Sequence, residues 1–141
     1  MAVDVQLEML VDGKASGDLL VLSEGLSFWG GLDPATGLII DRQHPEHGAC
    51  VTAAVLVLPA PRGSTAAPGA LLECLASGKG PAAIILAQRD PTAVAAVLAA
   101  AMIDLPTIPV ARLPGPGALQ TLPDRHWVSI DHGLLKVNQA G

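Results

Sequence analysis

The feature that most constrains the fold is an almost unbroken aliphatic run near the middle of the chain, from Val51 to Leu58. A strand with one face in solvent alternates apolar and polar residues, whereas a strand covered on both faces is apolar throughout. Pro59 ends the run, and after a loop rich in proline, glycine and alanine a helix is predicted over 70–77, with Gly78 in the usual stop position. This strand, loop and helix predict one unit of an α/β fold.

A second unit of the same kind follows directly. Residues 81–87 form another apolar run, and Asp90 before Pro91 is a good helix start, because the carboxylate can accept from free N–H groups and proline has no N–H to satisfy. A helix is predicted over 92–102 and a further strand over 107–111. We therefore expect a βαβαβ segment.

The N-terminal part predicts additional strands. Apolar residues alternate with polar or small ones over 5–11, and a second strand is predicted over 19–22. Dense glycine and proline over 23–37 predict an ordered loop that leads to a short strand at 38–41.

The C-terminal part predicts a hairpin, with strands over 126–130 and 134–137 and a turn at residues 131–133, Asp-His-Gly. The complete order predicts a β-rich barrel or sandwich with the βαβαβ segment on one side. The chain has 141 residues, 50% of them hydrophobic, so it can bury one core, and we expect a single domain over 1–141.

Charge and hydropathy argue against two classes of partner. Eight Lys and Arg stand against thirteen Asp and Glu, for a net charge of −5, and no basic cluster is present, so we expect no nucleic acid. The most apolar stretch, 93–103, is far shorter than the about 20 residues that span a bilayer, so we expect no membrane partner. Residues 1–5 lack the basic start of a secretory signal, which predicts a cytoplasmic location.

Cysteine and histidine spacing gives little support for a metal site on this chain. Cys50 and Cys74 match no C-x-x-C or Cys/His pattern and are expected to be buried thiols without a role. Residues 44–47, His-Pro-Glu-His, have ligand types, but Pro45 opposes the helix that would align the two histidines. The polar residues near the last hairpin are expected to be solvated turn residues: Asp124, His126, Asp131 and His132.

The first candidate site is the sequence Arg62-Gly63-Ser64-Thr65, between the end of a core strand and the start of a helix. Loops in this position bind ligands in α/β folds, and free N–H groups at a helix start attract anions. Arg62 could hold a carboxylate, Gly63 could admit the ligand, and the Ser64 hydroxyl could face the reacting atom. The alternative is that Ser64 or Thr65 only caps the helix.

The second candidate is a loop that contains Phe28, Trp29, Gly30 and Gly31. Aromatic residues beside paired glycines often mark an interface or the lip of a pocket. The alternative is that Phe28 and Trp29 fill one end of a core that is poor in aromatic residues.

Three segments together resemble a known family. Residues 27–37 (SFWGGLDPATG), residues 40–45 (IDRQHP) and residues 63–65 (GST) resemble the aconitase X swivel-domain family, with the likeness running roughly over 17–110. The resemblance implies an α/β fold, the swivelling β/β/α barrel domain of aconitase. It further implies a separate small subunit that binds a large aconitase X subunit, as a heterodimer or higher assembly, and is inactive alone.

The resemblance also implies the chemistry. Ser64 would act in proton transfer at carbon, with Arg62, Gly63 and Thr65 around the substrate, and Phe28 to Gly31 at the interface or pocket lip. The chain itself would hold no cofactor, and an iron–sulfur cluster or iron would belong to the large subunit. The alkoxide of Ser64 would need stabilisation by Arg62, nearby N–H groups or a lysine of the large subunit.

Two substrates and two other classes remain open. Relatives of this kind dehydrate cis-3-hydroxy-L-proline or mevalonate 5-phosphate, and Arg62 before the glycine, where the archaeal type tends to have lysine, favours hydroxyproline. A phosphohistidine carrier would need a histidine where Ala66 and Ala67 stand. A noncatalytic binding or regulatory module is the other alternative.

Overall fold

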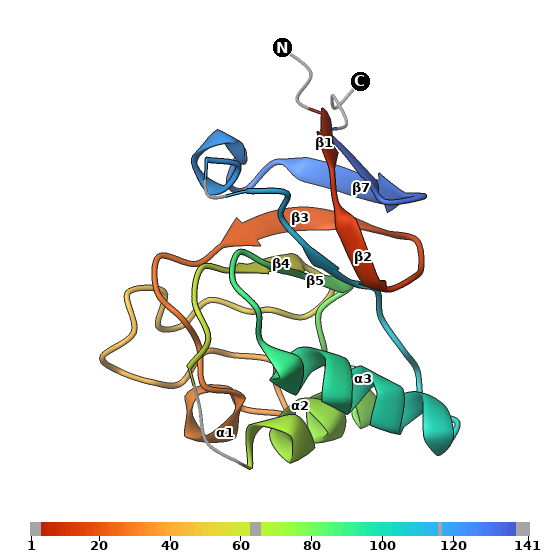
Figure 1. Ribbon diagram of the computed structural model, residues 1–141. Coiled ribbons are helices and arrows are strands. Elements are labelled where there is room, and N and C mark those ends of the chain that lie inside the picture. Colours follow the sequence, from red (N-terminus) through yellow and green to blue (C-terminus); the bar gives the residue numbers. More distant parts are fainter. Residues whose placement is uncertain (1–3, 63–65, 116, 138–141) are drawn as a thin grey trace.

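The computed structural model describes residues 4–62, 66–115 and 117–137. Over these residues the chain forms an eight-stranded mixed sheet with the strand order β1-β8-β7-β3-β4-β5-β6-β2 (Figure 1). The strands are β1 (Asp4–Gln6), β2 (Glu8–Val11), β3 (Ala15–Val21), β4 (Val55–Leu58), β5 (Ala83–Leu86), β6 (Val110–Arg112), β7 (Trp127–Asp131) and β8 (Leu134–Val137). The helical segments are α1 (Phe28–Gly31), α2 (Ala67–Ala76), α3 (Pro91–Met102) and the 3₁₀ turn η1 (Leu119–Thr121).

The two ends of the strand order are consecutive in sequence, so the sheet wraps around on itself. β1 pairs antiparallel with β8, whereas β2 pairs antiparallel with β6. Between them, Leu7 is buried at 4% exposure and its N–H donates to the Gly133 carbonyl at 2.7 Å. The prediction of one strand over 5–11 is therefore wrong, because the chain passes from one side of the barrel to the other at Leu7.

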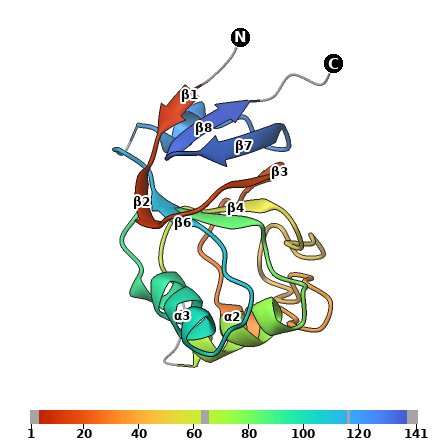
Figure 2. The same ribbon diagram turned by 90° about the vertical axis from the view of Figure 1, so that its right-hand side faces the viewer.

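Strands β3, β4, β5 and β6 are parallel neighbours, as the βαβαβ pattern predicts. The helices α2 and α3 lie on one side of this layer, and β7 and β8 lie on the other (Figure 2). The predicted strand over 51–58 is shortened at its start, because residues 51–54 form a turn in which the Ala54 N–H donates to the Val51 carbonyl at 3.0 Å. Ala53 in this turn has a φ of 60°.

The helix ends follow the predicted capping chemistry in one case and depart from it in the other. The Asp90 carboxylate accepts from the Thr92 N–H at 3.0 Å, which confirms the predicted start of α3. Helix α2 begins three residues earlier than predicted, at Ala67, with Pro68 in its first turn. It ends at Ala76 before Gly78, which has a φ of 77°.

The predicted C-terminal hairpin is confirmed. Asp131 pairs with Leu134, and the two turn residues His132 and Gly133 have φ values of 51° and 77°, the left-handed pair of a type I′ turn. The predicted short strand at 38–41 is wrong, since only single bridges form there, from Leu38 to Cys50 and from Ile39 to Leu32.

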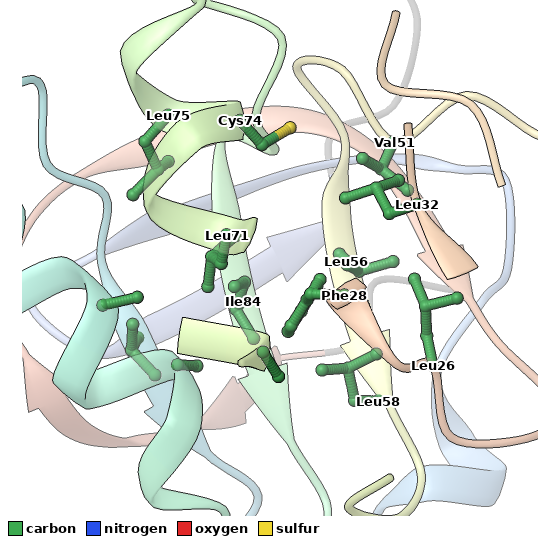
Figure 3. Close-up of a cluster of buried hydrophobic side chains, with 14 of the residues drawn as sticks. Leu26, Phe28, Leu32, Val51, Leu56, Leu58, Leu71, Cys74, Leu75 and Ile84 are labelled. Atoms are coloured by element: carbon green, nitrogen blue, oxygen red, sulfur yellow. The ribbon is translucent and has the colours of Figure 1, made fainter. Parts of the chain in front are cut away.

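Two apolar clusters share strands β4 and β5, whose successive side chains point to opposite faces. The cluster inside the barrel, called the barrel-side cluster, receives Val55 and Val57 of β4 and Ala83 and Ile85 of β5. The second, called the helix-side cluster, is shown in part in Figure 3 and lies under α2, α3 and the loop that follows β3. Its members from the two strands are Leu56, Leu58, Ile84 and Leu86.

Among the described residues, no helix is both long enough and apolar enough to span a bilayer.

Candidate functional site

The candidate site lies at the carboxyl ends of the parallel strands β3 and β4. Because parallel strands end at the same edge of a sheet, the loops that follow β3 and β4 meet there. Arg62 stands in the loop after β4. Gly63, Ser64 and Thr65 lie outside the described residues, so their predicted roles remain predictions.

Arg62 faces two carboxylates. Its guanidinium nitrogens lie 3.9 Å from the Glu24 carboxylate and 3.8 Å from the Asp41 carboxylate, and its side chain is 48% exposed. Both distances exceed hydrogen-bond length, and exposed ion pairs of this kind contribute little to stability. The two acids therefore keep Arg62 nearby while its N–H donors remain available to an anionic ligand.

Gly25 lets the two loops pack closely. A Cβ at position 25 would lie 2.6 Å from the Ala60 carbonyl oxygen and 3.0 Å from the Arg62 Cβ. No side chain fits into this space without moving the backbone of the second loop. The loop after β3 is thus packed directly against the residue that precedes the predicted catalytic motif.

His44, one of the two histidines in the weighed metal motif, is buried and has structural partners. It is 3% exposed, its Nδ1 accepts from the Glu46 N–H at 3.0 Å, and its Nε2 lies 3.3 Å from the Glu24 carbonyl oxygen. A nitrogen that accepts from an N–H and a nitrogen that faces a carbonyl oxygen are the arrangement of a ring that accepts at Nδ1 and donates at Nε2. Nδ1 also lies 3.2 Å from Glu46 Oε2.

Glu46 also binds the loop that follows β3. Its Oε1 accepts from the Ser23 N–H at 2.7 Å and from the Ser23 hydroxyl. Its Oε2 is buried without a hydrogen-bond partner among the described residues. His44 and Glu46 together fasten residues 23 and 24 beneath Arg62.

The aromatic loop buries one of its two aromatic side chains and exposes the other. Phe28 is 2% exposed and lies among Leu56, Leu58 and Ile84 in the helix-side cluster, so for Phe28 the core-filling interpretation is confirmed and the lip interpretation is wrong (Figure 3). Trp29 is 61% exposed, because the backbone becomes extended at this residue and turns at Gly30, which has a φ of 83°.

Further exposed apolar side chains lie beside Trp29. Ile40 is 46% exposed and Leu38 is 38% exposed, while Ile39 between them is buried. The Ile40 N–H donates to the carbonyl of the buried Gly31 at 2.9 Å, which brings this segment against the aromatic loop. We call Trp29, Leu38 and Ile40 the apolar rim. Residues 38–40 are all apolar in the sequence, which therefore gives no sign of which of them are exposed.

Comparison with known proteins identifies the family. The family model described as the aconitase X swivel domain matches residues 4–137. The chain belongs to the aconitase X swivel-domain family. The predicted family and its α/β swivel-domain fold are thereby confirmed.

The relatives of this aconitase X swivel domain include two kinds of dehydratase. The chain is 40% identical over 131 residues to the cis-3-hydroxy-L-proline dehydratase of Hypocrea jecorina, a match that covers 93% of the chain and 22% of that protein. It is 35% identical over 130 residues to the phosphomevalonate dehydratase small subunit of Methanothermobacter thermautotrophicus, covering 92% of the chain and 94% of that subunit. The chain thus spans about a fifth of the fungal protein and nearly all of the archaeal one.

A solved structure has the same fold. The crystal structure of Thermococcus kodakaraensis aconitase X in its holo-form superposes with a TM-score of 0.81 at 27% identity, covering 97% of this chain and 99% of that one. The shared fold supports the barrel and the helix layer described above.

The resemblance implies an iron–sulfur cluster or iron in the large subunit, and this remains a prediction. Among the described residues no group of three or more His, Cys, Asp or Glu side chains could hold a metal ion. Cys50 is exposed and Cys74 is buried. Burial, with the nearby Cys50, Asp33 and Glu73, raises the pKa of Cys74 to about 11, which disfavours the thiolate that a metal requires.

The polar residues near the last hairpin are mainly turn residues, with one exception. Asp131 and His132 are exposed, as predicted. Asp124 accepts from the Val21 N–H at 2.9 Å and so fastens the segment before β7 to the end of β3. This structural role was not predicted.

An open apolar groove of about 590 Å³ lies on another part of the surface, between β2 and α3. Leu10, Val94 and Leu98 line it, together with Arg89 and the Glu8–Arg112 ion pair. Arg62, Glu24 and Asp41 do not line this groove.

Proposed function

We propose that this chain is the small subunit of a hydro-lyase that removes water from a hydroxy acid. The observation that carries the proposal is the placement of Arg62, with available N–H donors, at the carboxyl edge of β3 and β4 directly before the Gly63-Ser64-Thr65 sequence. The names of both kinds of relative, which are dehydratases, support it.

We propose cis-3-hydroxy-L-proline as the substrate and 1-pyrroline-2-carboxylate as the product. Arg62 binds the substrate carboxylate, and Ser64 accepts the proton from the carbon next to it. The hydroxyl leaves with a second proton as water, and the resulting enamine isomerises to the imine. A serine acts as a base only if its alkoxide is stabilised, and the Arg62 guanidinium is the cation that this chain offers.

The second candidate is dehydration of mevalonate 5-phosphate. It is favoured by the similarity to the archaeal small subunit, which is 35% identical over 130 residues. Both reactions eliminate water from a hydroxy acid, so the roles of Arg62 and Ser64 are the same. Turnover with the two substrates distinguishes them.

The large subunit is part of the proposal, because Arg62 lies in an open edge and the described residues offer no metal site. We place the iron–sulfur cluster or iron in that subunit and the complex in the cytoplasm, where the two free thiols remain reduced. The apolar rim beside the site, Trp29, Leu38 and Ile40, is the surface we assign to the large subunit.

The catalytic role is tested with Ser64→Ala in the reconstituted complex. We expect kcat to fall by about 100-fold or more, with unfolding and assembly unchanged, because one proton-transfer group is removed. Ser16→Ala, which removes an exposed serine from β3, is the matched control and should leave kcat as it is. Full activity in Ser64→Ala would support a noncatalytic module. Unfolding would indicate that Ser64 has a structural role other than the N-cap of α2, because that position is occupied by Ala66.

The rim is tested with Trp29→Ala against Trp127→Ala, since the two tryptophans are 61% and 48% exposed. Trp127 lies in β7, on the side of the barrel away from the helices. We expect Trp29→Ala to raise the Kd of assembly by about tenfold or more and Trp127→Ala to change it by less than about threefold. Equal effects would contradict the assignment of this surface.

A further inference from the structure

His44 is the polar side chain with the deepest burial among the described residues, at 3% exposure. It belongs to the IDRQHP segment, to which the dehydration chemistry assigns no role. Burying an imidazole is costly unless both nitrogens find partners, and here both do. Its partners belong to the two segments that supply the carboxylates around Arg62.

The two side-chain hydrogen bonds of His44 have partners in different segments. The acceptor Nδ1 holds the Glu46 N–H at 3.0 Å, within the turn that His44 itself begins. The donor Nε2 reaches across to the Glu24 carbonyl at 3.3 Å, in the loop that follows β3. Only the second bond joins two segments that are distant in sequence.

Asp41 is oriented by the same turn. Its carbonyl accepts from the His44 N–H at 3.1 Å, and its Oδ1 accepts from the Gln43 N–H at 3.0 Å. Its other oxygen, Oδ2, is the one that faces the Arg62 guanidinium at 3.8 Å. The turn therefore fixes Asp41, and the His44 imidazole fixes Glu24 relative to it.

We propose that His44 is a positioning residue for Arg62. Its Nε2–H bond to Glu24 sets the separation of the Glu24 and Asp41 carboxylates, and these hold the guanidinium where it meets the substrate carboxylate. The inference rests on the proposed function, in which Arg62 binds that carboxylate. His44 touches neither substrate nor reacting atoms.

Two substitutions of His44 each keep one of its two side-chain hydrogen bonds and remove the other. The amide of Asn reaches the place of Nδ1, so His44→Asn keeps the acceptor for Glu46 and loses the donor to Glu24. The amide of Gln reaches the place of Nε2, so His44→Gln keeps the donor to Glu24 and loses the acceptor. Each variant loses one hydrogen bond, but Asn is also one methylene group smaller than Gln, so a merely structural role predicts a larger loss of stability for His44→Asn and no difference in KM between complexes that fold.

The positioning role predicts unequal effects in the reconstituted complex with the large subunit. His44→Asn should raise KM by about tenfold and should also lower kcat, because Arg62 both binds the substrate carboxylate and stabilises the Ser64 alkoxide in the proposed function. His44→Gln should raise KM by no more than about threefold. Equal KM values for the two variants, or a loss in kcat alone, would overturn the proposal.

A spectroscopic measurement on the isolated full chain is independent of catalysis. The ¹⁵N spectrum should show His44 as the neutral Nε2–H tautomer, and the Nε–H signal of Arg62 should be shifted and broadened in His44→Asn but close to wild type in His44→Gln. An imidazolium, an Nδ1–H tautomer, or an Arg62 signal that is insensitive to His44 would overturn the inference even if the dehydratase activity is present.

Arg62→Ala separates this inference from the proposed function. Suppose that Arg62→Ala leaves KM unchanged while the spectra of the His44 variants show the expected shifts. The proposed contact between Arg62 and the substrate is then wrong, but the positioning of Arg62 by His44 still holds. If His44→Asn does not fold, Asp41→Asn replaces it, since this carboxylate is 28% exposed and outside the core. It should raise KM by about threefold or more, and an unchanged KM would overturn the positioning network.

Discussion

The barrel-side and helix-side clusters use the same two strands, β4 and β5, and yet they support different parts of the molecule. The barrel-side cluster is filled mainly by strand residues and is enclosed by the barrel. The helix-side cluster also takes in side chains from the irregular segment between β3 and β4. These are Leu22, Leu26, Phe28, Leu32, Ile39, Val51 and Ala54.

The difference shows how a segment without regular secondary structure can have a defined conformation. The loop that carries Glu24, Trp29 and Asp41 has few ladder hydrogen bonds, but those of its apolar side chains that belong to the helix-side cluster are buried as deeply as those of the strands. Burial in the helix-side cluster therefore sets the shape of the site, whereas burial in the barrel-side cluster sets only the barrel. Matched substitutions in the two clusters should separate stability from assembly.

The largest expected effect comes from Phe28→Ala compared with Ile85→Ala. Both side chains are almost fully buried, at 2% and 0% exposure, so we expect losses of about 3–5 kcal/mol and about 2–5 kcal/mol in the free energy of unfolding. Urea unfolding measures these losses. Below the unfolding transition, only Phe28→Ala should also weaken binding of the large subunit, because it releases the aromatic loop.

If Ile85→Ala weakened assembly as much as Phe28→Ala, the separation between the two clusters would be wrong.

A smaller effect is expected inside the loop itself, from Gly37→Ala compared with Gly30→Ala. Both glycines have positive φ, 76° and 83°, but a Cβ at Gly37 would meet the Thr52 hydroxyl and the Lys79 carbonyl, while a Cβ at Gly30 meets nothing within 4 Å. We expect Gly37→Ala to cost about 3 kcal/mol and Gly30→Ala about 1 kcal/mol in thermal or urea unfolding. Equal costs would mean that backbone strain alone determines both values.

The thiols give a pH-dependent comparison. The pKa of buried Cys74 is raised to about 11, so its thiolate fraction at pH 8 is about a thousandth and native alkylation should be confined to the exposed Cys50. The folded state keeps the Cys74 proton to higher pH than the unfolded state does. The resulting stability is present below the ordinary thiol pKa of about 8.5 and is lost as the pH rises toward 11.

Urea unfolding at pH 8 and at pH 10.5 measures this loss, and mass spectrometry counts the alkylated thiols. Cys74→Ala should have a smaller drop in stability between the two pH values than the wild type. Rapid labelling of Cys74 in the native protein would show that the helix-side cluster opens easily.

Much of this architecture could be predicted from the sequence, for identifiable reasons. The βαβαβ segment, the Asp90 cap and the His132–Gly133 turn follow from local periodicity and turn chemistry. The break at Leu7 could not be predicted, because the alternation over 5–11 continues through it and only the pairing with two different strands divides it. The early start of α2 was also missed, since Ala67 and Pro68 resemble the loop before them.

The candidate site was predicted only in part. The sequence drew attention to Arg62, the aromatic loop and His44. Nothing local places Glu24 and Asp41 around Arg62, because these two acids are far apart in the long segment after β3 and Arg62 follows β4. Phe28 and Trp29 are adjacent and aromatic, and only the backbone turn at Gly30 decides which one is buried.

The smallest expected effect is a gain in stability on either side of the molecule. Ala53, in the turn before β4, and His132, in the hairpin between β7 and β8, have φ values of 60° and 51°. Replacing each with glycine relieves the left-handed strain and should raise the free energy of unfolding by about 0.5–1 kcal/mol. A loss of stability in Ala53→Gly would mean that its methyl group contributes packing.

The most direct test of the central claim is the dehydration of cis-3-hydroxy-L-proline, with mevalonate 5-phosphate alongside it, by this chain mixed anaerobically with the large subunit from its own genome. We predict turnover of hydroxyproline by the mixture and none by either subunit alone. A stable, metal-loaded complex that turns over neither substrate would contradict the proposed dehydration while leaving the swivel-domain fold in place.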